Sequence, residues 1–500
     1  MRQNIPFNNS YSKLPERFFS HVSPTPVNAP KLIKLNVPLT QELGLCESWL
    51  TSDEGVAMLA GNFIPQGAQP LAAVYAGHQF GYFSPQLGDG RAVLLGEIIG
   101  KNGRLDVQLK GAGPTPYSRQ GDGRAALGPV LREYIMSEAM FALGVPTTRA
   151  LACVTTGEGV IRNEILPGAI ITRIAASHIR IGTFQYFAAC SDQDAVKILA
   201  DYVIKRHYPD AANAPNPYAA LLISVVEKQA ELVAKWQNIG FIHGVMNTDN
   251  MSVSGETIDY GPCAFMDVYD PETVFSSIDS NGRYAYSNQP KVAQWNLARF
   301  AETLMPLLAR SEAEALSIAQ SAIDSFNTLF ENAFFNGMRS KLGLFTTDQD
   351  DEALIKDLLA LLQHKKLDYT VFFYKISDFN VYFDDEDLNT WVRRLTERAA
   401  RESQSQSRHR QGLHKEGLHS QSSQNIAERF SLMKRSNPAY IPRNHLVEEA
   451  IKAAVRHNNY TPFQNLTNVL SNPYQRQEGY EKYALPPETS TEKYYTFCGT

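Results

Sequence analysis

The stretch HGVMNTDNMSVSGETIDYG, residues 243–261, spaces a histidine, an asparagine and the tripeptide Asp-Tyr-Gly along one short segment. Asn250 lies five residues after Val245, and Asp259 opens the tripeptide. An amide oxygen and a carboxylate are hard ligands that suit a Mg²⁺ ion bridging phosphate groups. We therefore predict that Asn250 and Asp259 are metal ligands at a phosphate-binding site.

The intervals match those of kinase-fold phosphotransferases, in which H-x-D-x-x-x-x-N precedes a strand and an Asp-aromatic-Gly turn. Val245 occupies the position of the base, and valine cannot accept a proton. Asp249 is the only carboxylate in residues 243–250, so it is the candidate replacement base. A base displaced by four residues should face a different phosphorus, because catalysis needs near-attack geometry. Alternatively, Asp249 caps a local turn.

Upstream, two apolar runs flank the sequence KNG and predict a β-hairpin over residues 91–111. Lys110 ends the second strand, where a lysine can neutralise phosphate oxygens. Glu133, on a predicted helix that ends at Gly144, is its expected partner. Glu138 is the other candidate but points roughly 140° away around the helix. Alternatively, the lysine and the glutamate are both solvated surface residues.

The segment GAGPTPYSRQGDGR, residues 111–124, is rich in glycine and carries two arginines. Glycines let backbone N–H groups approach an anion, and arginine adds a fixed charge. The segment therefore predicts a second anion-binding loop, although a plain surface turn would have a similar composition. The sequence contains no Walker A motif, which disfavours a P-loop nucleotide hydrolase.

The composition bounds the class of protein. The chain has 500 residues, is 43% hydrophobic and carries a net charge of −5, which predicts two or more lobes and no nucleic-acid partner. No apolar run reaches membrane-spanning length and the start lacks a signal peptide, so we expect no membrane partner. Five cysteines without a CxxC pair favour a reducing compartment, and we expect a cytoplasmic protein.

Helical periodicity dominates the second half of the chain, at residues 217–239, 291–308, 312–342 and 351–364. Residues 1–70, rich in Pro, Asn and Ser, predict an extended segment with little regular structure that wraps on the lobes. The polar segment 401–426 predicts a flexible low-complexity loop.

Long ordered segments resemble one family, selenoprotein O (SelO), the protein adenylyltransferases with a protein-kinase-like fold. The matching segments include YAGHQFGYFSPQLGDGRAVLLGE (75–97), LKGAGPTPYSRQGDGRA (109–125), TRIAASHIRIGTF (172–184), HGVMNTDNMS (243–252) and TIDYGPCAFMD (257–267). The resemblance implies an α+β bilobal fold with N- and C-terminal extensions. The smaller, mixed β/α nucleotide lobe would span residues 71–190, the larger, mainly helical lobe 191–400, and the C-terminal extension 427–500.

The resemblance also implies an activity: transfer of AMP from ATP to Ser, Thr or Tyr hydroxyls of proteins, with ATP reversed relative to kinases. Asp249 would be the base. Asn250 and Asp259 would hold Mg²⁺, with Mn²⁺ as an alternative. The implied nucleotide-binding residues are Gly88, Gly90 and Arg91 of a first loop, Lys110 with its partner Glu133, Asp122 and Gly123 of an extra pocket, Arg173 and Arg180 at the buried phosphate end, and Asp259.

Cys498 matches a cysteine near the C terminus of family members. In bacterial relatives that cysteine pairs with one shortly after the Asp-Tyr-Gly turn, but serines stand there in residues 270–280, and Cys263 is displaced. Two rival functions are a kinase that transfers the γ-phosphate and a non-catalytic pseudokinase that only binds nucleotide. Val245 argues against the first, and the retained Lys110, Asn250 and Asp259 argue against the second.

Overall fold

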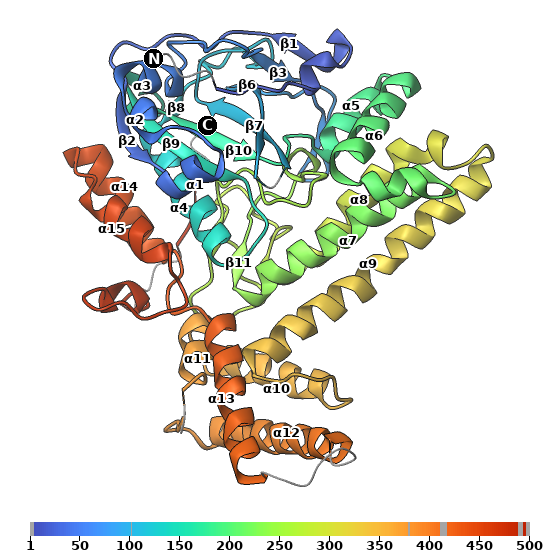
Figure 1. Cartoon of the computed structure of the whole chain (residues 1–500), viewed down its shortest axis with the longest axis vertical. Coiled ribbons are helices and arrows are strands. Elements are labelled where there is room, and N and C mark those ends of the chain that lie inside the picture. Colours follow the sequence, from blue (N-terminus) through green and yellow to red (C-terminus); the bar gives the residue numbers. More distant parts are fainter. Residues whose placement is uncertain (1–4, 102, 379–380, 411–417, 489–493, 497–500) are drawn as a thin grey trace.

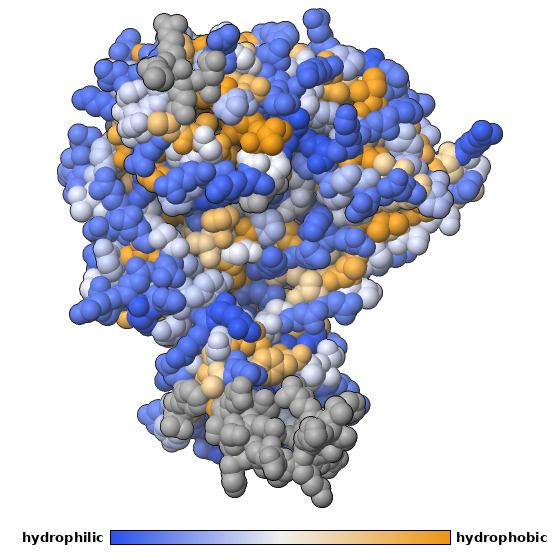
Figure 2. Space-filling view, in the orientation of Figure 1, coloured by the Kyte–Doolittle hydropathy of each residue, from blue (hydrophilic) through white to orange (hydrophobic). Residues whose placement is uncertain are grey.

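The computed structural model describes residues 5–101, 103–378, 381–410, 418–488 and 494–496. It combines an antiparallel β-sheet with a larger set of helices. Figure 1 shows the sheet at one end of the molecule, the long helices α7, α8 and α9 below it, and α10 to α13 at the opposite end. On the face shown in Figure 2, hydrophilic residues predominate and apolar residues are scattered among them.

The main sheet is built almost entirely from adjacent antiparallel strands. Its order is β1 (Phe19–His21), β3 (Leu71–Ala73), β6 (Ala92–Gly100), β7 (Gly103–Lys110), β10 (Ile165–Ala175), β9 (Arg149–Ile161) and β2 (Lys31–Leu35), with β8 (Ala125–Ala126) beside β10. Strands β6 and β7 form the predicted hairpin, and Lys110 ends β7 opposite Ala92. Because β7 lies in the middle of the sheet, this lysine is held between two neighbouring strands.

The N-terminal segment is more regular than predicted. Strands β1 and β2 form the two edges of the main sheet. Helices α1 (Val37–Glu42), α2 (Glu47–Leu50) and α3 (Asp53–Leu59) bury Leu39, Leu50 and Leu59 in one cluster with strand residues of β6 and β7. The prediction of little regular structure was wrong because short apolar runs between the prolines suffice for edge strands and one-turn helices. Two 3₁₀ turns, η1 (Tyr11–Lys13) and η2 (Glu16–Phe18), precede β1.

Helix α4 (Leu127–Ala142) is buried along most of its length between two layers. One side packs against the sheet, and the other packs against the C-terminal helices α14 (Asn444–His457) and α15 (Thr461–Leu470). The rings of Tyr134 and Phe463 meet at 5.5 Å in this second layer. The C-terminal segment therefore completes the core around the helix that carries Glu133.

The helical half begins with α5 (Ile181–Ala189), α6 (Gln193–His207) and α7 (Pro217–Asn238). The side chain of Asn216 caps α7 by accepting from the N–H of Ala219, and Gly240 follows the helix end at a φ of 72°. Helices α8 (Gln289–Leu308), α9 (Glu312–Lys341) and α10 (Asp351–His364) confirm the predicted ranges within two residues. Short 3₁₀ turns are η3 (Pro209–Asn213), η4 (Thr248–Asn250), η5 (Tyr286–Asn288) and η6 (Glu481–Ala484).

The predicted loop at 401–426 is largely helical. Residues 401–410 end α12 (Glu386–Arg410), residues 418–426 begin α13 (Leu418–Ser436), and residues 411–417 lie outside the described residues. Glu402 of α12 accepts from Arg429 of α13 at 2.8 Å, so the two helices are joined by an ion pair. The polar composition indicated contact with water, but it does not exclude a helix that is polar on most sides.

Helix α11 (Tyr369–Lys375) lies next to this pair in the sequence and packs into a second cluster with α9 and α10. Among the described residues, no helix has both the length and the apolarity to cross a membrane.

Candidate active site

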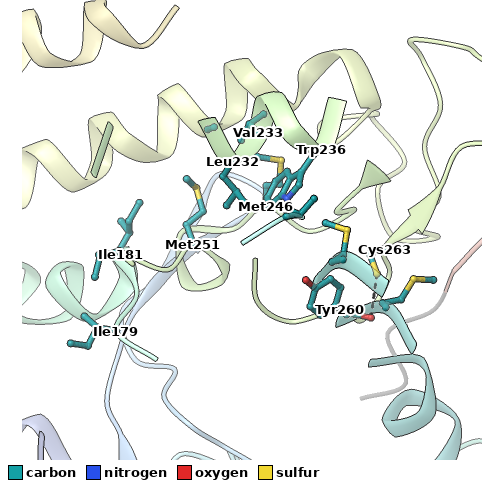
Figure 3. Packing of buried hydrophobic residues seen from close by; sticks show 14 of the residues in the cluster. Ile179, Ile181, Leu232, Val233, Trp236, Met246, Met251, Tyr260 and Cys263 are labelled. Atoms are coloured by element: carbon teal, nitrogen blue, oxygen red, sulfur yellow. Dashed lines mark hydrogen bonds between the residues drawn. The ribbon is translucent and has the colours of Figure 1, made fainter. Parts of the chain in front are cut away.

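The loop from His243 to Gly261 is anchored by apolar side chains that pack against α7. The short strands β11 (Phe241–Ile242) and β12 (Ala264–Phe265) pair at its two ends. Met246 and Met251 lie on either side of Asp249 in the sequence. In Figure 3, Met246 lies beside Leu232 and Trp236 of α7, and Met251 lies between Leu232 and Ile181. The loop is therefore held on both flanks, and the residues between the two methionines keep a fixed position.

His243 supports the loop and has no free role in chemistry. Its ring Nε2 lies 2.9 Å from the carbonyl oxygen of Ile258, and its backbone N–H donates to Gln289. Burial lowers the pKa of the imidazole, so the ring is neutral at physiological pH. Asn250 donates through Nδ2 to the carbonyl of Val245 at 3.0 Å, which closes the loop.

Lys110 and Glu133 form the predicted pair, with Nζ 2.7 Å from Oε2. Lys110 also lies 3.2 Å from Oδ1 of Asp259. Burial and Arg173 lower the pKa of Lys110. The alternative partner Glu138 is engaged elsewhere, where it accepts from Arg149 at 2.8 Å.

Asp259 is surrounded by cations. Arg173 donates to Asp259 and to Glu133, and Arg180 donates to the other Asp259 oxygen at 2.5 Å. The two arginines are only 1% and 3% exposed. Burial alone would raise the pKa of Asp259, but Arg173, Arg180 and Lys110 hold it well below its usual range. Three cations therefore face two carboxylates, and one positive charge remains for an anion.

Asp249 has a different environment from the other two carboxylates. Asp249 is 7% exposed, and its Oδ2 accepts from Nε2 of Gln79 at 3.2 Å. Oδ1 is buried and has no hydrogen-bond partner among the described residues. Burial raises the pKa of Asp249 to about 6. A buried carboxylate with one free oxygen and a pKa near neutrality suits a general base.

A short hairpin, β4 (Gly77–Gln79) with β5 (Tyr82–Ser84), covers the base, and the sequence pattern alone assigned it no role. The backbone N–H of His78 donates to Thr248 Oγ1 at 2.7 Å, and that of Phe80 donates to Asn247 Oδ1 at 3.2 Å. A Cβ atom on Gly77 would lie 2.3 Å from Asp249 Oδ1. The signal in the sequence is a glycine two residues before Gln79, where only glycine lets the strand approach the base.

The two glycine-rich loops pack on each other. A Cβ atom on Gly88 would meet the Tyr117 ring at 2.5 Å, and the carbonyl of Gly90 accepts from Ser118. The carbonyl of Arg91 accepts from the N–H of Gly111 at 2.7 Å. The predicted loops therefore form one layered unit beside the end of β7.

Asp122 and Gly123 form hydrogen bonds to residues outside the ion cluster. Asp122 accepts from Arg162 at 2.8 Å, and its side chain is half-exposed. The carbonyl of Gly123 accepts from the N–H of Gly113 at 3.1 Å, and its φ of 64° with the close approach of Gly113 excludes a side chain. Their predicted contact with nucleotide stays a prediction.

The residues present fit a Mg²⁺ ion. Asp259 is ionised, as a metal ligand must be, and none of the described residues hydrogen-bonds to Oδ1 of Asn250. Because three cations now occupy the oxygens of Asp259, metal binding would require some of them to exchange partners with phosphate.

Cys46, Cys153 and Cys190 carry free thiols. The Cys263 sulfur lies 3.6 Å from the carbonyl oxygen of Tyr260, shown by the dashed line in Figure 3. Cys498, and with it any pairing of that thiol, lies outside the described residues.

Known proteins match this chain over nearly its whole length. The family model described as protein adenylyltransferase SelO matches residues 1–471. The chain is 56% identical to the protein nucleotidyltransferase YdiU of Anoxybacillus flavithermus, 55% to that of a strain of Rhodopseudomonas palustris and 54% to that of a strain of Methylorubrum extorquens. The alignments cover at least 99% of this chain and of each relative. The chain therefore belongs to the SelO family and is a nucleotidyltransferase.

Proposed function

We propose that this protein transfers AMP from ATP to Ser, Thr or Tyr hydroxyls of acceptor proteins and releases pyrophosphate. The observation that carries the proposal is Asp249. The loop has a valine at the usual position of a base, and four residues later a buried carboxylate with one unpartnered oxygen. A nucleotide-binding module without catalysis would have no use for such a group.

In the proposed reaction, Asp249 accepts the proton of the acceptor hydroxyl through Oδ1. The hydroxyl oxygen forms a bond to the α-phosphorus, and the bond from that phosphorus to the bridging oxygen of pyrophosphate breaks. Gln79 holds the other carboxylate oxygen at 3.2 Å, which fixes the direction of the free one. The proton thus leaves the nucleophile as the negative charge moves to pyrophosphate.

The buried cations support a reversed nucleotide. Arg173 and Arg180 are among the least exposed residues of the site and lie beside Lys110 and Asp259. Guanidinium groups bind phosphate oxygens in pairs and remain charged when buried. With the terminal phosphates bound to them, the γ-phosphate lies deep and the α-phosphate lies toward Asp249 and the acceptor.

Mg²⁺, or Mn²⁺, would be held by Asn250 and Asp259 and would neutralise charge on the triphosphate. We also propose that the sheet with β7 and α4 acts as the nucleotide lobe of a kinase-like bilobal fold, and that α5 to α9 act as the helical lobe. The pairing of Lys110 with Glu133 and the position of the loop below the sheet support this division.

The released product tests the reaction class. With ATP, Mg²⁺ and an acceptor protein, an enzyme-coupled assay should detect pyrophosphate and no ADP. Asp249→Asn should lower the rate by about 10²–10⁴, the usual contribution of a general base, while ATP binding measured by calorimetry persists. Release of ADP in proportion to modified protein would reject the proposal in favour of a kinase.

A further inference from the structure

The hairpin β4–β5 is built around a tight two-residue turn. Phe80 and Gly81 both have positive φ, 53° and 89°, as a type I′ turn requires. The ring of Phe80 packs against Tyr284 at 5.1 Å, which holds a non-glycine residue in this conformation. The turn and the contacts of β4 with the base loop fix β5 in place next to the proposed catalytic centre.

The residues of β5 that share a face with the base can be identified from the pairing. Gln79 faces Tyr82 and Gly77 faces Ser84, so all four side-chain positions lie on one side of the hairpin. Gln79 and Gly77 both contact Asp249. Tyr82 therefore projects on the same side as the base, and it is 82% exposed.

The outer edge of β5 offers backbone groups to a partner. In a two-residue hairpin the residues next to the turn exchange hydrogen bonds, so His78 and Phe83 direct their N–H groups outward. The outward N–H of His78 donates to Thr248. That of Phe83 has no partner among the described residues, and β5 pairs only with β4 there. Such an edge accepts an added extended segment.

A cation lies at the tip of the hairpin. The Arg283 guanidinium carbon would be 3.7 Å from a Cβ atom on Gly81 and lies 4.8 Å from the centre of the Trp295 ring. No carboxylate in the described part of the chain forms an ion pair with Arg283, whereas the neighbouring Arg299 is paired with Glu302 at 2.7 Å. This positive charge is suited to a negatively charged group of a partner, in contrast to the net charge of −5 of the chain.

We propose that Tyr82, the edge of β5 and Arg283 form an acceptor-docking surface for an extended acidic segment of another protein. This inference rests on the proposed function. Successive strands lie about 4.8 Å apart, so an added segment would run roughly 10 Å from β4, and the residues that flank the modified hydroxyl would occupy the edge. The part of the bound segment between these flanking residues then brings the hydroxyl to Asp249. An acidic side chain of the same segment contacts Arg283.

Two synthetic peptides test the proposal. Each contains one threonine as its only hydroxyl residue, flanked on both sides by glutamates in one peptide and by lysines in the other. With ATP labelled at the α-phosphate, the protein should modify the glutamate peptide with a kcat/KM about tenfold or more above that of the lysine peptide. Arg283→Glu should remove or reverse this preference, and Tyr82→Ala should raise the KM for the peptide, with the KM for ATP unchanged in both variants.

Lys356→Glu is the matched control, because Lys356 is an exposed cation on α10, paired with Glu352, and its reversal should leave the preference intact. Equal modification of the two peptides, or a preference untouched by Arg283→Glu, would overturn the docking surface. The docking surface would also be overturned if a mixture of unphosphorylated casein and histone is labelled while neither peptide is labelled. If no protein or peptide acquires the label, the proposed function itself fails.

Discussion

Asp249 differs from the neighbouring carboxylates in what its oxygens contact. Glu133 and Asp259 are bound by lysine and arginine, so their negative charge is already compensated. Asp249 accepts from the neutral amide of Gln79, and its buried Oδ1 has no hydrogen-bond partner in the part of the chain that the structure describes. Carboxylates in direct ion pairs hold cations and metals in place, whereas one outside such a pair can take a proton. This difference separates the role of Asp249 from those of Glu133 and Asp259.

The pKa of Asp249 predicts how transfer depends on pH. Only the ionised carboxylate accepts a proton, and burial raises its pKa to about 6. The rate should therefore be highest above about pH 6 and fall roughly tenfold per unit below it. Transfer rates at saturating ATP, measured with the wild type and with Asp249→Asn, would show this: the residual rate of the variant should lack the inflection. A wild-type rate that stays unchanged between about pH 5 and pH 7 would remove Asp249 from the role of base.

Arg173 should also be required for stability. It is 1% exposed and donates to both Glu133 and Asp259. Arg173→Met therefore leaves Glu133 with Lys110 alone and Asp259 with Lys110 and Arg180. Removing one member of a buried ion cluster typically costs about 3–5 kcal/mol of unfolding free energy. Arg456→Met breaks an exposed pair with Glu164 and should change stability little. Urea unfolding of the two variants compares them, and equal stabilities would contradict the structural role.

At the residue scale, spacing offered Glu133 as a partner of Lys110 with two solvated residues as the alternative, and the family resemblance assigned the pair. Helical position favoured Glu133 over Glu138, and the structure has Glu133 in an ion pair with Lys110. The contacts of Arg173 could not be predicted from the sequence, because they depend on the register of β7 against β10. That register sets Arg173 opposite Gln108, two residues before Lys110 and on the same face of the sheet.

At the scale of elements, the hairpin β4–β5 and the base loop behave as one unit. His78, Phe80 and Gln79 each hydrogen-bond to a different residue of the loop between Asn247 and Asp249. Thr248 in turn donates to Gln185 of α5 at 2.5 Å. The base is thus positioned by a strand, a helix and its own loop.

Gly77→Ala tests this contact. The added methyl group would lie 2.3 Å from Asp249 Oδ1, a distance that forces the strand or the carboxylate to move. We expect transfer to fall by more than tenfold, because misplacement of a base by about 1 Å can cost about 10² in rate.

Gly128→Ala is the control, since its methyl group meets only the Ile451 side chain, at 3.1 Å, in a helix that favours alanine. Both variants should show the thermal unfolding of the wild type. If Gly77→Ala transfers AMP as fast as Gly128→Ala, the hairpin does not position the base.

Long elements with strong periodicity were the most predictable. The core helices α7 to α10 followed from apolar spacing. The polar segment 401–426 was predicted as a loop because it has no apolar face, yet α12 and α13 extend into it. Edge strands such as β2 were missed, because five residues give too short a pattern among prolines.

At the scale of the whole molecule, the C-terminal helices belong to the same core as the site. Val447 of α14 and Phe463 of α15 are fully buried in the cluster that also contains α4 residues. Arg132, next to Glu133 in the sequence, is bound by Glu448 and by Tyr494 near the end of the chain. Residues more than 300 positions apart therefore meet around one helix, and sequence periodicity cannot reveal such contacts.

Phe463→Ala should destabilise the entire protein. Removing a buried phenylalanine typically costs about 3–5 kcal/mol, and here the lost contact includes the Tyr134 ring on α4. Leu485→Ala is the control in the same C-terminal segment, because Leu485 is exposed. Denaturant unfolding should show one cooperative transition, shifted to lower denaturant for Phe463→Ala only. A separate early transition for that variant would mean that the C-terminal helices form an independent unit.

The central claim is that this fold delivers the α-phosphorus, and not the γ-phosphorus, to a protein hydroxyl. ATP labelled separately at the α- and γ-phosphates, incubated with the protein, Mg²⁺ and an acceptor, tests it most directly. We predict that α-label is retained on protein, that γ-label is released with pyrophosphate, and that Asp249→Asn retains α-label at a rate about 10²–10⁴ lower. Retention of the γ-label on protein would contradict the account.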